Sequence, residues 1–244
     1  MTLRERIDNT LERIEAACAR AGRSPSEVTL IAVSKTQPPT AVEEAYNLGI
    51  RHFGENKVQE LVQKYEGLKG VCTDINWHLI GHLQRNKVKQ AIDKAVLIHS
   101  VDSLRLGQMI EQEASKKNLV CDVLIQLNIA REDTKFGVAE EELMSLFMEL
   151  IKLPHLRIRG LMAIAPYVDD PEKNRKYFSK MRQLFIDIKT KNIDNGLTDI
   201  YFNPDSFDTL SMGMTGDFEV AVEEGATMVR IGTGIFGERS YSIK

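Results

Sequence analysis

The sequence predicts an α/β protein built as one (β/α)8 TIM barrel, and two observations support that prediction. Short apolar segments typical of buried strands alternate with amphipathic helical segments along the chain. Strict alternation of this kind requires a parallel sheet. Eight such units within 244 residues fit a closed barrel better than an open sheet.

The predicted strands are short, apolar and rich in β-branched residues, as expected for strands that are buried on both faces. The first ends at Lys35, and Pro38 follows three residues later. We expect the eight strands at residues 29–35, 50–54, 76–81, 96–100, 122–129, 157–164, 208–212 and 227–231.

Helix-start and helix-stop signals separate these strands. Pro38 and Pro39 favour a helix start, and Gly49 and Gly225 favour helix ends. We expect helices at residues 38–48, 84–92, 139–150, 171–189 and 218–224. Two more helices should begin at residues 55–56 and after a capping residue at 102 or 103. Residues 193–205 are less regular.

An extra helix is predicted at residues 2–21, before the first strand. Thr2 and Glu5 have the spacing of a capping box, and Gly22 ends the helix. Apolar residues recur at three- and four-residue steps, so this helix should cover the bottom or side of the barrel. The expected apolar face is Leu3, Ile7, Leu11, Ile14 and Ala17.

The bulk composition excludes several classes of protein. A formal net charge of −3 with dispersed basic residues gives no field that favours nucleic acid or an anionic membrane. Three distant cysteines without a C-x-x-C pair argue against a disulfide framework or a zinc site. No apolar run could span a bilayer, and the charged N-terminal helix is no signal peptide. We expect one cytoplasmic domain over residues 1–244, since the connections are short and no linker is visible.

Lys35 is the first candidate functional residue, because it stands where a buried strand meets the functional edge of the barrel. A partly desolvated amine has a lowered pKa and can attack a carbonyl carbon. A strand-end lysine that simply reaches water is the alternative. Other polar or small residues expected at this edge are Glu55, Asn56, Gly81, His82, Ser100, Asn128, Met162, Ser211, Gly213, Arg230, Gly232 and Thr233.

The turns after the last two strands could hold a phosphate. Ser211 with Gly213, and Gly232-Thr233-Gly234, combine hydroxyl donors with glycines that let backbone amides approach an anion. Barrel phosphate sites commonly use these two loops, although tight turns that close the barrel would look similar. The G-x-G-x-x-G pattern of residues 232–237 is not a dinucleotide site, because no βαβ unit follows it.

Arg230 lies in an otherwise apolar strand just before this cradle. A buried arginine needs a partner, either a carboxylate or a ring nitrogen of a bound ligand. His78 and His82 do not converge on a strand as two metal ligands would on a helix, so we expect no metal site. Glu55, Asp217 and Glu219 stand at helix starts, where acids are usually caps.

A reactive lysine, a phosphate cradle and an arginine near a ring nitrogen fit one cofactor, pyridoxal 5′-phosphate. Lys35 would form a Schiff base with its aldehyde. A charged arginine discourages protonation of the pyridine nitrogen, which leaves the ring a weaker electron sink.

The sequence also resembles the pyridoxal phosphate homeostasis protein family, whose members correspond to the N-terminal barrel of alanine racemase. The motifs run in order over nearly the whole chain. They are residues 32–36 (AVSKT), 53–60 (FGENKVQE), 77–87 (WHLIGHLQRNK), 160–162 (GLM), 210–214 (LSMGM) and 229–237 (VRIGTGIFG). One difference is Thr215-Gly216, where other members have a serine followed by a variable residue.

The resemblance implies a role for each matching residue. Lys35 carries the Schiff base, Arg230 faces the pyridine nitrogen, and Ser211, Gly232 and Thr233 hold the phosphate. Asn56 and Met162 line the surroundings of the ring.

The resemblance further implies a cofactor carrier without established turnover, in which no residue is assigned as catalytic. Apo forms of pyridoxal-phosphate-dependent enzymes are then the expected partners, and we expect a monomer. An amino-acid racemase is the first alternative. Similar racemases take a second base, a tyrosine, from a C-terminal domain that has no counterpart here, which leaves Tyr167, Tyr201 and Tyr241 as candidates by residue type only. A Schiff-base aldolase that uses Lys35 is the second alternative.

Overall fold

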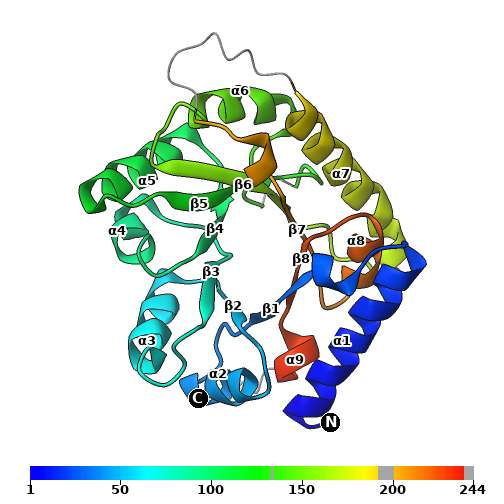
Figure 1. Cartoon of the computed structure of the whole chain (residues 1–244). Helices are drawn as coiled ribbons and strands as arrows, with labels where there is room; N and C mark the ends of the chain where they lie inside the picture. Colours follow the sequence, from blue (N-terminus) through cyan, green and yellow to red (C-terminus); the bar gives the residue numbers. More distant parts are fainter. Residues whose placement is uncertain (133–134, 192–200, 239–244) are drawn as a thin grey trace.

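The computed structural model describes residues 1–132, 135–191 and 201–238. Within these ranges the strands form a closed barrel in the order β1 to β8, and every neighbouring pair is parallel (Figure 1). The predicted barrel is therefore confirmed. Its strands are β1 (Thr29–Val33), β2 (His52–Glu55), β3 (Asn76–Leu79), β4 (Leu97–Val101), β5 (Cys121–Leu127), β6 (Leu156–Ala163), β7 (Thr209–Met214) and β8 (Met228–Ile231).

Helices surround the barrel, so apolar side chains fill the layer between strands and helices (Figure 1). The helices are α1 (Leu3–Arg20), α2 (Pro39–Asn47), α3 (Val58–Leu68), α4 (Val88–Ala91), α5 (Leu104–Lys117), α6 (Glu140–Leu150), α7 (Arg175–Thr190), α8 (Phe218–Glu223) and α9 (Thr233–Phe236). Short 3-10 turns are η1 (Pro25–Glu27), η2 (Arg85–Lys87), η3 (Pro171–Asn174) and η4 (Pro204–Ser206).

Several boundaries differ from the sequence prediction. The helix expected from Glu55 begins at Val58, because Glu55 is still part of strand β2. The helix expected at 84–92 is only the turn η2 followed by α4, and the first turn of the helix expected at 171–189 is η3. Helix α9 was not predicted. Of the stretch expected to be irregular, residues 193–200 lie outside the described residues.

The N-terminal helix α1 lies on the side of the barrel, against α8 and α9 (Figure 1). Its capping box between Thr2 and Glu5 is present. Leu11 is 41% exposed, while Thr10 and Cys18 are buried, so the buried face of α1 differs from the prediction at these positions. In addition, Arg6 Nε donates to the Ile235 carbonyl of α9 at 2.6 Å, which holds the last helix in place.

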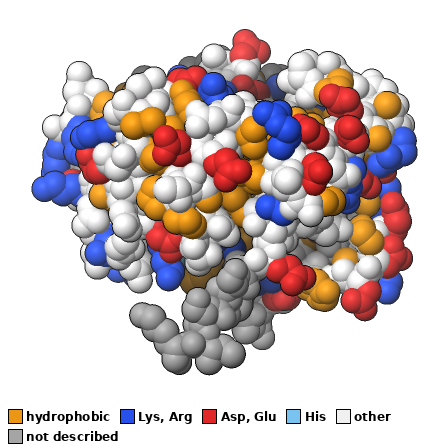
Figure 2. Space-filling view, turned by 90° about the horizontal axis from the view of Figure 1, so that it is seen from below, with side chains coloured by type: hydrophobic (Ala, Val, Ile, Leu, Met, Phe, Trp, Pro, Cys, Tyr) orange, Lys and Arg blue, Asp and Glu red, His pale blue; other side chains and the backbone are white. Residues whose placement is uncertain are grey.

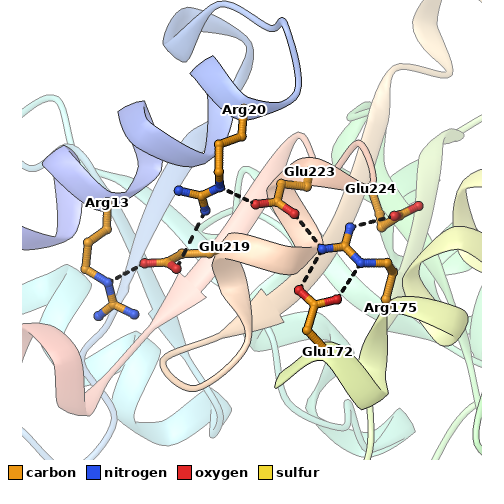
Figure 3. Close-up of polar contacts among 7 residues, drawn as sticks. All are labelled: Arg13, Arg20, Glu172, Arg175, Glu219, Glu223 and Glu224. Atoms are coloured by element: carbon orange, nitrogen blue, oxygen red, sulfur yellow. Dashed lines mark hydrogen bonds and ion pairs between the residues drawn. The ribbon is translucent and has the colours of Figure 1, made fainter. Parts of the chain in front are cut away.

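An ion-pair network ties α1 to α8 and α8 to the start of α7 (Figure 3). On α1, Arg13 Nε lies 2.6 Å from Glu219 Oε1. At the other end, the Arg175 guanidinium bridges Glu223 at 2.6 Å and Glu224 at 2.9 Å. Hydrogen bonds to Glu172, Glu223 and Glu224 hold the pKa of Arg175 above its usual value. The network positions the helices that stand over β7 and β8.

A bulge in β6 decides which side chains face the inside of the barrel. Val123 pairs with Ile158 but Leu124 pairs with Gly160, so β6 holds one extra residue. Gly160 has a φ of +152°, and a Cβ there would lie 1.7 Å from the backbone carbonyl oxygen of Thr209. The bulge reverses the side-chain alternation and turns Met162 inward, where it packs with Leu97, Leu124, Ile164 and Met228.

The surface carries mixed charges. On the face shown in Figure 2, basic and acidic side chains are interspersed with apolar ones. In the described part of the chain, no helix is long and apolar enough to cross a membrane.

Candidate functional site

Lys35 lies two residues after the end of β1 and is half-buried in a turn held by hydrogen bonds. Thr36 has a φ of +65°, an uncommon conformation for a residue with a Cβ. The Thr36 amide donates to Glu60 Oε2 at 2.7 Å, and the Gln37 amide donates to the Ser34 carbonyl at 2.9 Å. Helix α3, which carries Glu60, therefore fixes the turn that presents the lysine.

A buried ion pair supports the same turn from behind. Lys64 Nζ of α3 lies 2.6 Å from Glu55 Oε1 and donates to the Ser34 carbonyl at 2.7 Å. Ser34 Oγ donates to the same Glu55 oxygen at 2.7 Å, while Glu55 Oε2 has no hydrogen-bond partner among the described residues. Burial raises the pKa of Glu55, and Lys64 opposes that shift. Glu55 is thus a structural ion-pair partner and not the helix cap that we expected.

Arg230 is buried inside the barrel, with 4% of its surface exposed. Its Nη1 donates to Ser211 Oγ at 2.6 Å and its Nη2 to the Ala163 carbonyl at 2.9 Å. Within the described residues it forms no ion pair. Burial lowers the pKa of Arg230 to about 10, so the guanidinium still carries its charge at neutral pH. No carboxylate of the described residues lies within ion-pair distance of Arg230, and the more distant charge of Asp217 only opposes the fall in its pKa.

Ser211 lies within β7 and is fully buried. Its hydroxyl contacts Arg230 and also lies 3.0 Å from His99 Nδ1. The structure therefore brings Ser211 and Arg230 together, as the sequence suggested, and places the Ser211 side chain beside the guanidinium.

The sequence reasoning missed a row of three histidines that continues from Ser211, and it considered His78 only as a metal ligand. His99 Nε2 lies 3.0 Å from His78 Nδ1, and His78 Nε2 lies 2.9 Å from His52 Nδ1. They come from β4, β3 and β2, and we call them the histidine row. Burial lowers the pKa of His78 to about 3 and that of His99 well below its usual value. A polar residue at the inward position of three successive strands is the signal that could have revealed them.

The predicted phosphate cradle lies at the end of β8. Gly232 precedes the short helix α9. A Cβ at Gly232 would lie 3.7 Å from Val33 of the neighbouring strand β1. Because Ala32 pairs with Ile231, Lys35 and Gly232 follow adjacent strand ends. The Gly234 amide donates to Thr215 Oγ1 at 3.4 Å, which joins the loops after β7 and β8.

Thr233 lies just after β8 and Gly213 near the end of β7, at the two strand ends of the predicted cradle. Thr233 is exposed at the first position of α9. Gly213 has a φ of +90°, and a Cβ there would lie 2.6 Å from the Ala221 Cβ of α8. Only glycine therefore fits at this point of β7.

Asn56 and Met162 lie at different depths. Asn56 is half-buried just after β2. A Cβ on Gly81 would lie 2.2 Å from the backbone carbonyl oxygen of Asn56. The loops after β2 and β3 thus approach closely at a glycine. Met162 is fully buried among the apolar side chains inside the barrel.

The remaining acids have structural partners. Asp217 Oδ1 accepts from the Met214 amide at 2.7 Å, and Asp217 Oδ2 accepts from Asn174 Nδ2 at 2.8 Å. Asp217 therefore holds the loop before α8 and makes no side-chain cap of the helix. Glu219 pairs with Arg13 of α1.

Two of the three tyrosines considered as a second base lie within the described residues. Tyr167 follows β6 and is 93% exposed. The Tyr201 amide donates to the Ile151 carbonyl, which places it near the start of β6, at the opposite end of the barrel. Tyr241 lies outside the described residues.

Comparisons with known proteins agree over nearly the full length. A family model for the N-terminal domain of alanine racemase matches residues 7–240. The chain is 48% identical over 237 residues to the pyridoxal phosphate homeostasis protein of Aquifex aeolicus, covering 97% of this chain and 98% of the relative. It is 40% identical over 234 residues to the protein of that name from Escherichia coli, covering 96% and 95%.

Two solved structures show how far the similarity extends. PipY of Synechococcus elongatus with PLP bound has a TM-score of 0.77 at 34% identity, covering 97% of this chain and 100% of PipY. Alanine racemase of Corynebacterium glutamicum has a TM-score of 0.66 at 17% identity, covering 95% of this chain and 62% of the racemase. The second likeness is one of fold alone.

Proposed function

The chain belongs to the pyridoxal phosphate homeostasis protein family, and from that membership we propose that it binds pyridoxal 5′-phosphate and takes part in the intracellular supply of this cofactor. PipY, a related protein with the same fold, has been solved with PLP bound. Binding without turnover of a substrate of its own is the form of this function that the site supports best.

The observation that carries the proposal is the environment of Arg230. A buried guanidinium without a carboxylate partner in the described barrel is suited to an acceptor supplied by a ligand. The pyridine nitrogen of the cofactor is such an acceptor. A glycine-rich turn follows Arg230 directly, and a half-buried lysine follows the adjacent strand. The guanidinium, the turn and the lysine would then bind the ring nitrogen, the phosphate and the aldehyde of one cofactor.

We assign the site residues as follows. Lys35 would hold the cofactor through its amine, as a Schiff base with the aldehyde that forms with loss of water. Gly232 and Thr233 hold the phosphate with backbone and hydroxyl donors. The resemblance assigns Ser211 to the phosphate as well, and in the structure its side-chain oxygen accepts a hydrogen bond from Arg230. Asn56 and Met162 line the surroundings of the ring.

The same geometry argues against efficient racemisation. The bound cofactor would supply an electron-withdrawing ring, and Arg230 keeps its charge at neutral pH and so discourages protonation of the ring nitrogen. A two-base reaction also needs a second proton carrier near Lys35. Tyr167 is almost fully exposed, and Tyr201 lies at the other end of the barrel. We therefore favour a carrier, with apo-enzymes as partners and a monomeric cytoplasmic protein.

The test combines binding and turnover on the purified protein. Titration with pyridoxal 5′-phosphate should give an absorption band above 400 nm with the wild type, since an imine conjugated to the ring absorbs there. Lys35→Ala should lose this band, whereas Lys57→Ala, which changes an exposed lysine on the same face, should keep it.

Two further assays separate the carrier from an enzyme. The loaded protein should transfer its cofactor to the apo form of a pyridoxal-phosphate-dependent enzyme, and L-alanine should not racemise in its presence. Steady racemisation that disappears in Lys35→Ala would overturn the carrier proposal. A wild-type protein that takes up no cofactor would overturn the binding proposal, and the aldolase alternative would then gain weight.

A further inference from the structure

The interior of the barrel contains a continuous row of polar side chains, and the proposed function uses none of its three histidines. It leads from Arg230 through Ser211 to His99, His78 and His52. Each link is 2.6–3.0 Å long. His78 and His99 are buried and His52 is half-buried, so the row runs from the guanidinium to the start of β2.

The direction of hydrogen bonding along this row follows from its first member. A guanidinium only donates, so Ser211 Oγ must accept from Arg230 Nη1. The Ser211 hydroxyl then has its own proton to donate, and its other side-chain partner among the described residues is His99 Nδ1. A hydroxyl oxygen has two lone pairs, so the contact with His99 fits either direction; we infer that the Ser211 proton points to His99 Nδ1, since this gives the proton an acceptor, and that His99 Nδ1 carries no proton.

The remaining two links are then determined. A neutral imidazole has one protonated and one bare nitrogen, so His99 carries its proton on Nε2 and donates to His78 Nδ1. By the same rule His78 donates from Nε2 to His52 Nδ1. The lowered pKa values of the buried pair keep both rings neutral at physiological pH. All three histidines are thus expected in the Nε2–H form.

We propose that the histidine row and Ser211 are positioning residues for Arg230. With its own proton committed to His99, the Ser211 hydroxyl turns a lone pair toward the guanidinium and fixes its orientation. His99 acts only through Ser211. The part of this proposal that concerns the cofactor rests on the proposed function, whereas the direction of the row does not.

The direction is tested without cofactor. In long-range 1H–15N correlation spectra of protein labelled with 15N-histidine, His52, His78 and His99 should all show a protonated Nε2 and a bare Nδ1. His82 and His155 lie outside the row and supply reference signals in the same spectrum. Protons on the Nδ1 atoms would mean that the row runs the opposite way and would overturn the proposal.

The positioning role is tested with substitutions of His99. His99→Asn keeps an acceptor close to the place of Nδ1, so its cofactor affinity and absorption band should match the wild type. His99→Leu leaves the Ser211 hydroxyl without that acceptor and should weaken cofactor binding about tenfold, with a shifted band. His155→Asn changes a histidine bound to Glu111 and should alter neither property.

The outcomes separate the two proposals. His99→Leu with wild-type affinity and spectrum would overturn the positioning role. If His99→Leu does not fold, the tautomers of the wild type still decide the direction. If the wild type binds no cofactor, the proposed function fails and the tautomers still test the row.

Discussion

Removing the charge of Lys64 should destabilise the protein far more than removing a surface lysine. Lys64 is 4% exposed, and its ammonium group lies 2.6 Å from Glu55 Oε1 and 2.7 Å from the Ser34 carbonyl. In Lys64→Met both acceptors lose the ammonium group, and the Ser34 carbonyl keeps the Gln37 amide as a donor. The Glu55 carboxylate would then keep only the Ser34 hydroxyl as a side-chain partner in the described residues.

The size of the effect follows from burial. Breaking a buried pair leaves an uncompensated charge and costs about 3–5 kcal/mol. The control is Lys69→Met, which changes an exposed lysine paired with Glu66 and should cost about 0–1 kcal/mol. The double variant Glu55→Leu/Lys64→Met removes both charges, so it should recover much of the stability lost in Lys64→Met.

Acid should reduce the cost of Lys64→Met. Burial raises the pKa of Glu55, and the loss of Lys64 removes an opposing effect. A carboxyl whose pKa is higher in the folded than in the unfolded state binds protons more tightly when folded. The variant is therefore stabilised relative to the wild type as the pH falls toward the ordinary pKa of a glutamate.

Urea unfolding at pH 7.5 and 5.5, followed by circular dichroism, measures these free energies of unfolding. A cost below about 1 kcal/mol for Lys64→Met at pH 7.5 would refute the reasoning from burial, since that is the range of an exposed pair. A cost that grows in acid would refute the direction assigned to Glu55.

Two further predictions concern the interior of the barrel. The pKa values of His78 and His99 are lowered in the folded state, so unfolding takes up protons near and below pH 6.5 and stability falls as the pH decreases. The expected loss of stability between pH 7.5 and 5.5 is about 1 kcal/mol for each histidine. Equal urea midpoints at the two pH values would contradict it. Gly160→Ala should cost about 2–4 kcal/mol, because the added Cβ would lie 1.7 Å from the Thr209 oxygen at a φ of +152°. Gly67→Ala within α3, where a Cβ meets nothing within 4 Å, should instead raise the melting temperature, and equal shifts in both variants would argue against the steric explanation.

The parts of the molecule that follow from local pattern were predictable. The alternation of apolar strands and helices gave the barrel, and the boundaries of its strands lie within a few residues of the expected ones. Lys35 and Gly232 could be placed together because the ends of parallel strands meet at one edge. Arg230 stood out because it is a charge in an apolar strand.

Contacts between distant segments were not predictable from local pattern. The histidine row joins β2, β3 and β4 to β7, and its last link spans 112 residues. Glu55 looked like a helix cap because the sequence does not show that Lys64 reaches back to it. The inward turn of Met162 depends on a bulge at Gly160, and the place of Tyr201 depends on a contact with Ile151.

The central claim, that Lys35 holds pyridoxal 5′-phosphate, is tested most directly by borohydride reduction of the loaded protein followed by peptide mapping. Reduction should fix the cofactor to the peptide that contains Lys35 with a yield close to one per chain. Lys35→Ala should then give no fixed cofactor. An adduct on Lys57 or another lysine, with the Lys35 peptide unmodified, would contradict the assignment of the site.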